Sequence, residues 1–160
     1  MSKDRLFTRI PALAAATLLA AALPAAAADS FIGKVADVSD GDTIVVGNAG
    51  RVKVVQLAGI YAPELTQEYG VAARDFVKQL TKGKRVTVEI VETKNRQSLV
   101  AHVKVDGKDL AAAMVESGMA WTDQSATAGL QDAQQKAKTG GQGLWASANP
   151  TPPWEYRKSA

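Results

Sequence analysis

Apolar and polar positions alternate with a period of two in five stretches of the chain, which is the pattern of half-buried β-strands. In the fourth stretch, for example, Val86, Val88 and Ile90 share one face. Short runs rich in Gly, Asp and Asn separate the stretches, as turns between strands do. We therefore expect strands at residues 31–38, 43–46, 51–58, 85–91 and 99–105.

The pattern changes to a helical period in three other stretches, at residues 67–80, 110–117 and 130–138. Gly118 follows the second stretch and Gly140 the third, and glycine is a common helix stop. The glycines at 140–143 follow a helix and not a strand, so they do not indicate a phosphate-binding loop. The rest of the chain, through Trp154, is expected to be extended.

This order of elements indicates an α+β fold. A helix inserted between the third and fourth of five strands, with further helices at the C-terminal end, fits the oligonucleotide-binding (OB) fold best. That fold is a small closed barrel of five strands, here expected with about three helices. The length beyond the first 28 residues suits one domain, so residues 29–160 are expected to form a single OB-fold unit.

The first 28 residues have the layout of a cleaved export signal. Three basic residues precede an apolar run at 10–23, and small residues at 26–28 permit cleavage after Ala28. A membrane anchor is the alternative, but the run is shorter than the roughly 20 apolar residues that span a bilayer. We expect an exported, periplasmic or secreted protein that is monomeric and keeps no stable membrane span after cleavage.

Composition removes several classes of function. The whole chain has a net charge of +3, but the expected signal carries three of its basic residues and one acidic residue, so the remainder is nearly neutral. A nucleic-acid partner must therefore be recognised by a local patch of charge. The absence of cysteine excludes thiol catalysis and thiolate zinc sites, and the single histidine, His102, excludes a zinc site built from several imidazoles.

Acidic residues cluster near two expected turns. Asp40 and Asp42 lie on a tight turn before the second strand, and Glu64 follows the third strand. Neighbouring strands bring these side chains together, and carboxylates with a main-chain carbonyl form a partial ligand set for a hard cation, which takes six to eight oxygens. The alternative is that the two aspartates only hydrogen-bond to their own turn, and spacing alone favours that alternative.

Several separated motifs resemble the staphylococcal nuclease (thermonuclease) family. The resemblance spans about residues 32–156 and implies an OB-fold barrel whose active members hydrolyse DNA and RNA with calcium. It rests on these segments: Asp-Gly-Asp-Thr-Ile at 40–44, Leu-Ala-Gly-Ile at 57–60, Ala-Pro-Glu at 62–64, Gln-Glu-Tyr-Gly at 67–70, Gly-Leu-Trp at 143–145 and Pro-Pro-Trp-Glu at 152–155.

The resemblance assigns roles to four residues. Asp42 matches an aspartate that binds calcium, and Asp40 matches the acid that supports the water shell of the metal. Glu64 matches the glutamate that orients or deprotonates the attacking water. Ala62 stands where a main-chain carbonyl reaches the metal, so its side chain matters little there.

Three positions depart from the family pattern. Gln56 and Ser98 stand where the family has arginines, and Tyr61 replaces its second metal-binding aspartate. A guanidinium meets the charge that develops in phosphoryl transfer, so losing both is expected to lower the rate by roughly four orders of magnitude. A neutral phenol is a poor ligand for a hard cation, so calcium is expected to bind weakly. Tyr61 can instead pack or stack on a base, and packing is favoured.

Two cations lie near Ser98. If the segment is extended, Lys94 and Arg96 point the same way as Ser98 and form a basic edge for phosphate contacts. A solvated polar loop is the alternative, and it is the one we favour.

Three functions remain open. We favour an exported, degenerate nuclease-like domain with little or no phosphodiesterase activity that retains binding of single-stranded DNA or RNA. The first alternative is an active calcium-dependent endonuclease that uses Asp42 and Glu64. The second is an OB-fold module for an unknown protein or envelope partner.

Overall fold

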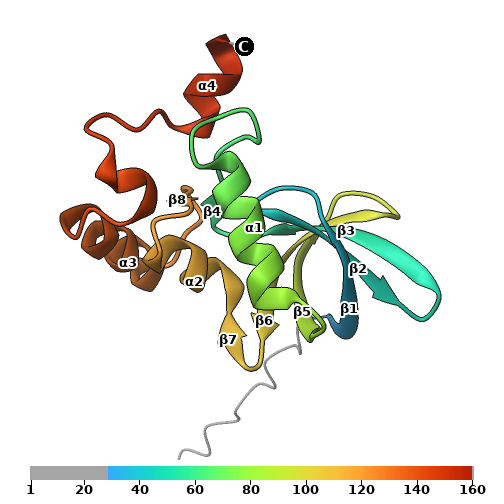
Figure 1. The fold of residues 1–160 in the computed structure, drawn as a ribbon. Coiled ribbons are helices and arrows are strands. Elements are labelled where there is room, and N and C mark those ends of the chain that lie inside the picture. The colour runs from blue at the N-terminus through green and yellow to red at the C-terminus, as the bar shows by residue number, and fades with distance from the viewer. Residues whose placement is uncertain (1–28, 160) are drawn as a thin grey trace, which may run out of the picture.

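The computed structural model describes residues 29–159, and the expected export signal lies outside them. Five strands form the barrel: β1 (Ser30–Val38), β2 (Thr43–Asn48), β3 (Arg51–Leu57), β5 (Arg85–Thr93) and β6 (Ser98–Val105). Neighbours in the order β3-β2-β1-β5-β6 are antiparallel, and a parallel pairing of β3 with β6 closes the barrel (Figure 1). The α+β fold and the OB-type barrel are confirmed.

The barrel interior contains the apolar residues that alternate along each strand. On β6, every second residue from Leu99 to Val105 is buried, and the intervening residues are only partly covered. Across the closing pair, Val55 lies opposite Leu99, and both side chains are buried. A one-residue shift of either strand would expose these side chains, so burial fixes the register.

Helices α1 (Gly70–Thr81) and α2 (Leu110–Glu116) pack against the barrel, and α3 (Ala128–Thr139) packs against α2. Asp109 caps α2 by accepting from the N–H of Ala112, and Thr127 caps α3 by accepting from the N–H of Leu130. α1 begins at Gly70, three residues later than predicted, because residues 65–69 form turns.

Three strands of two residues each were not predicted, because two residues show no period. β4 (Ile60–Tyr61) pairs with β8 (Trp121–Thr122), and β7 (Lys108–Asp109) extends the sheet beyond β6. The β4–β8 pair joins the barrel to the α2–α3 region. Tyr61 lies directly opposite Trp121 in this pair.

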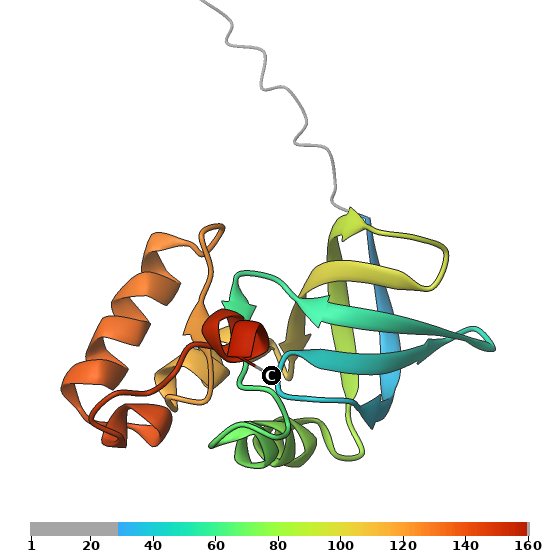
Figure 2. The same cartoon turned by 90° about the horizontal axis from the view of Figure 1, so that it is seen from above.

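The prediction of an extended C-terminal segment was wrong. Residues Gly143–Ala146 form a 3-10 helix (η1), and residues Pro153–Ser159 form a fourth α-helix, α4. Proline suits the first position of a helix, and Glu155 in the first turn complements the helix dipole. α4 lies above the junction between the barrel and the α2–α3 region (Figure 2). Among the described residues, no helix is both long and apolar enough to cross a membrane.

Candidate functional site

The turn before β2 positions the first pair of candidate acids. The carboxylate of Asp40 accepts a hydrogen bond of 3.0 Å from the N–H of Asp42, so Asp40 does make the turn contact that spacing alone favoured. Gly41, between them, packs tightly, since a Cβ there would lie 2.6 Å from the Cβ of Ala62 and 2.8 Å from that of Ala73. The glycine therefore brings this turn against β4 and α1.

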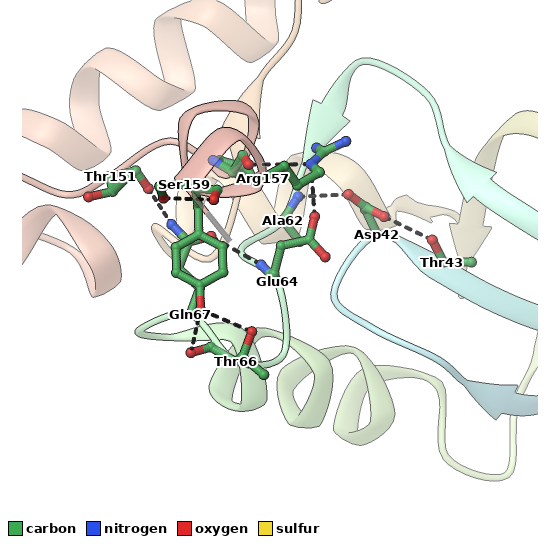
Figure 3. A network of polar contacts seen from close by, with 11 residues as sticks. Asp42, Thr43, Ala62, Glu64, Thr66, Gln67, Thr151, Arg157 and Ser159 are labelled. Atoms are coloured by element: carbon green, nitrogen blue, oxygen red, sulfur yellow. Dashed lines mark hydrogen bonds and ion pairs between the residues drawn. The ribbon is translucent and has the colours of Figure 1, made fainter.

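Asp42 points across to the chain beyond β4. One carboxylate oxygen accepts from the N–H of Ala62 at 2.8 Å, and the other accepts from the hydroxyl of Thr43 at 2.9 Å (Figure 3). The carbonyl of Asp42 accepts from the N–H of Leu57 at 2.8 Å. Asp42 thus connects the start of β2 with the end of β3 and with the loop that carries Glu64, as topology predicted.

Burial raises the pKa of Asp42 to about 7 from its ordinary value of 3.8, and the neighbouring charge of Asp40 adds to this effect. Hydrogen bonds from Ala62 and Thr43 act in the opposite direction but do not cancel the cost of burial. The environment of Asp42 therefore disfavours the ionised form of its carboxyl group.

Glu64 begins a tight turn that leads into α1. Its N–H donates to the side-chain oxygen of Gln67 at 3.2 Å, and its carbonyl accepts from the N–H of Gln67 at 2.8 Å. Gly70 follows so closely that a Cβ there would lie 1.8 Å from the carbonyl oxygen of Glu64. The Glu64 carboxylate is paired with Arg157 of α4, with Oε1 and Nε 3.0 Å apart (Figure 3).

The two positions that lack an arginine have different surroundings. The side-chain oxygen of Gln56 accepts a hydrogen bond of 3.2 Å from Nζ of Lys94, so an ammonium lies beside the first position. At the second, the N–H of Ser98 donates to the side-chain oxygen of Asn95 at 2.9 Å. This contact bends residues 94–97, so the extended conformation that would align Arg96 with Ser98 is not present.

Tyr61 lies in a cluster of aromatic rings that sequence reasoning missed. Its ring centre is 6.1 Å from that of Trp154, and Trp154 is 5.7 Å from Trp121, both edge-on. The guanidinium of Arg157 lies 5.6 Å from the centre of the Tyr61 ring. Trp154 and Arg157 both belong to α4. The only signal available for them was the Pro-Pro-Trp-Glu segment at 152–155, noted as a mark of resemblance and not as part of a site.

A cavity of about 710 Å³ opens beside this cluster. It is lined by Tyr61, Trp154, Arg157 and the loop of residues 122–125. Asp123 is the acid of that lining, and its carboxylate accepts hydrogen bonds from the N–H and the hydroxyl of Ser125. The cavity therefore combines aromatic surfaces with one half-exposed guanidinium.

Comparison with known proteins identifies the family of this chain. The profile of the family described as "Staphylococcal nuclease homologue" matches residues 54–147. The chain belongs to the staphylococcal nuclease family. An uncharacterized endonuclease of Escherichia coli is 35% identical over 78% of this chain and 84% of that protein. A micrococcal nuclease of Shigella flexneri is 32% identical over 93% of this chain and 92% of that protein.

In this member of the staphylococcal nuclease family, the described residues do not form a complete calcium site. No group of three Asp, Glu, His or Cys side chains within residues 29–159 is arranged to hold a metal ion. Both oxygens of Asp42 already accept protein hydrogen bonds, and Tyr61 offers no carboxylate. Calcium takes six to eight oxygens, so the Asp42 carboxylate supplies only part of a ligand set for this ion.

Replacing Asp42 by asparagine is expected to stabilise the metal-free protein at pH 8. The folded state binds the Asp42 proton more tightly than the unfolded state does, so its contribution to stability is lost as pH rises from 3.8 towards 7. The asparagine side chain keeps an oxygen for the N–H of Ala62 and carries no charge. Urea unfolding with chelator should show D42N gaining on the order of 2 kcal/mol over wild type at pH 8, and less at pH 5. A difference independent of pH would contradict this.

Proposed function

We propose that this chain is a nuclease-family domain that binds single-stranded DNA or RNA and has little or no phosphodiesterase activity. The observation that carries the proposal is the surroundings of Tyr61. At the position of a metal-binding carboxylate, its ring packs beside Trp154 and under Arg157. Tyr61 brings no carboxylate to Asp42, and Gln56 and Ser98 bring no guanidinium. Three of the expected site residues are therefore replaced, while Asp42, Glu64 and the fold that presents nucleic acid remain.

Charges and aromatic rings near the site support binding. Lys94 and Arg157 place cations on either side of the segment from Gln56 to Glu64, and both are positioned by a contact to it. Cations of this kind contact phosphates, and aromatic rings such as Trp154 stack with bases. The cavity of about 710 Å³ lies next to them.

An active calcium-dependent nuclease is the second candidate. It is favoured by the same two cations, since Lys94 beside Gln56 and Arg157 beside Glu64 restore positive charge near the two acids expected to act, Asp42 and Glu64. The names of the relatives, an endonuclease and a micrococcal nuclease, point the same way.

One measurement distinguishes the two candidate functions. Labelled single strands of DNA and of RNA, each about 20 nucleotides long, are incubated with the purified mature protein, with calcium or with chelator, and both binding and product length are followed. We expect binding that weakens steeply with salt and equal, negligible cleavage in both conditions. Calcium-dependent release of short products at the rate of a micrococcal nuclease run alongside would overturn the degenerate function.

We further propose that residues 1–28 direct export, on the basis of their basic, apolar and small-residue segments. Cell fractionation and the mass of the exported chain test this, with Asp29 as the expected first residue. A full-length chain retained in the cytoplasm would contradict it.

A further inference from the structure

Several independent contacts hold the C-terminal helix α4 against the site. The hydroxyl of Tyr156 lies 3.2 Å from the carbonyl oxygen and 3.1 Å from the hydroxyl of Thr66. The side-chain amide of Gln67 donates to the carbonyl of Thr151, just before the helix. Trp154 packs edge-on against Tyr61. These contacts fix the position of α4 without the ion pair between Arg157 and Glu64.

The guanidinium of Arg157 has hydrogen-bond donors that its contacts to the described residues do not use. Among residues 29–159, its guanidinium makes a hydrogen bond only through Nε, which donates to the carbonyl of Pro153 at 3.3 Å and lies 3.0 Å from the Glu64 carboxylate. The two Nη groups make no hydrogen bond to the described residues, and the side chain is 52% exposed. An arginine held at Nε with both Nη groups free of hydrogen bonds to the described residues can present the fork that binds a phosphate.

A purely structural role explains this arrangement less well. The partners of the ion pair are 52% and 41% exposed, and pairs of this kind contribute roughly 0 to 1 kcal/mol. α4 has the contacts of Trp154 and Tyr156 to hold it in place. Holding a guanidinium beside the family glutamate therefore adds little to stability, but it puts a cation where a bound strand needs one.

We propose that Arg157 binds a backbone phosphate of the single-stranded nucleic acid, so that the C-terminal helix supplies the guanidinium that is missing at Gln56 and Ser98. This rests on the proposed binding of nucleic acid. Glu64 then acts as a positioning residue, because it holds the guanidinium plane and competes with the phosphate for its charge. The cation over Tyr61 also explains why that ring is useful at this position.

The test compares Arg157→Gln with Lys158→Gln, because both remove one positive charge from α4. Among residues 29–159, Lys158 is paired only with Glu155 of the same helix. Binding of labelled single-stranded oligothymidylate is measured by fluorescence anisotropy over a salt series. R157Q should weaken binding about 10-fold and reduce the slope of log affinity against log salt by about 0.7, the value for one lost phosphate contact on a single strand. K158Q should change affinity by less than about 2-fold, with the slope retained.

Two further variants distinguish the effect of the positive charge at Arg157 from the effect of its planar guanidinium geometry. Arg157→Lys should keep the salt slope but weaken binding, because an ammonium cannot make the bidentate contact. Glu64→Gln should strengthen binding several-fold in the wild-type background and hardly at all in R157Q. Near-ultraviolet circular dichroism confirms that the tryptophans of the α4 contact remain packed in each variant.

Equal affinities and slopes for R157Q and K158Q, with wild type binding the strand, would overturn the role of Arg157 and leave the proposed function intact. If wild type shows no salt-dependent binding at all, the proposed function fails and the role of Arg157 fails with it.

Discussion

The variant Gln56→Arg, Tyr61→Asp, Ser98→Arg is expected to gain calcium-dependent cleavage of single-stranded DNA by at least about 10³-fold over wild type. The aspartate adds a second carboxylate near Asp42, and the two arginines return charge that stabilises the transition state. Release of acid-soluble products, with and without chelator, measures the gain. Gln56 and Ser98 lie on the closing β3–β6 pair of the barrel, and Tyr61 lies in the β4–β8 pair beside it, so the added groups have an ordered support.

A matched variant with both arginines but with Tyr61 retained should stay inactive, because it lacks the second metal-binding oxygen. The Lys94 ammonium now contacts Gln56 at 3.2 Å, and an arginine there meets a like charge. Adding Lys94→Gln to the triple variant should therefore raise its activity further. A folded triple variant that remains inert with calcium would show that the geometry around Glu64 no longer supports the reaction.

Gly70→Ala is expected to destabilise the protein by about 1 to 3 kcal/mol, although replacing glycine by alanine in a helix ordinarily stabilises by up to about 1 kcal/mol. The new methyl group would lie 1.8 Å from the carbonyl oxygen of Glu64 and 2.9 Å from the Cα of Leu65, both backbone atoms. The clash exceeds the helix propensity gain, so the turn that carries Glu64 must shift. Urea unfolding gives the loss of stability.

Gly129 provides the matched control. It also lies in the first turn of a twelve-residue helix, and a Cβ there would meet only the Thr127 hydroxyl oxygen, at 3.9 Å. Gly129→Ala should therefore stabilise the protein by about 0.5 to 1 kcal/mol. Similar changes in the two variants would show that the approach of Gly70 to Glu64 does not control stability.

The sequence contained enough information to predict the barrel but not the elements that complete it. A strand such as β6 alternates because one face lies in the core and the other does not, so its period is visible without tertiary information. The two-residue strands β4 and β8 have no period, and their pairing follows from the docking of the α2–α3 region. α4 has only seven residues and forms against Tyr61 and Thr66, which local sequence does not reveal.

The candidate site likewise contains residues that the sequence could place and residues that it could not. Strand order and the family resemblance were enough to predict that Asp42 lies near the loop of Glu64. The hydrogen bond from the N–H of Ala62 to Asp42 agrees with that prediction. Arg157 could not be placed, because no local pattern connects α4 to Glu64. Lys94 was predicted near Ser98, and its contact with Gln56 arises because the parallel β3–β6 pair carries both segments to one edge.

The docking of α4 makes the site depend on the C-terminal residues of the chain. All five strands of the barrel are complete by Val105, whereas the contact between Tyr156 and Thr66 joins residues 90 positions apart. The core cluster of buried residues continues to Leu130, so a chain that ends between α3 and α4 contains this core and yet lacks the guanidinium beside Glu64. Under the proposed function, proteolytic trimming of the last few residues would thus remove the phosphate contact of Arg157 and leave the barrel in place.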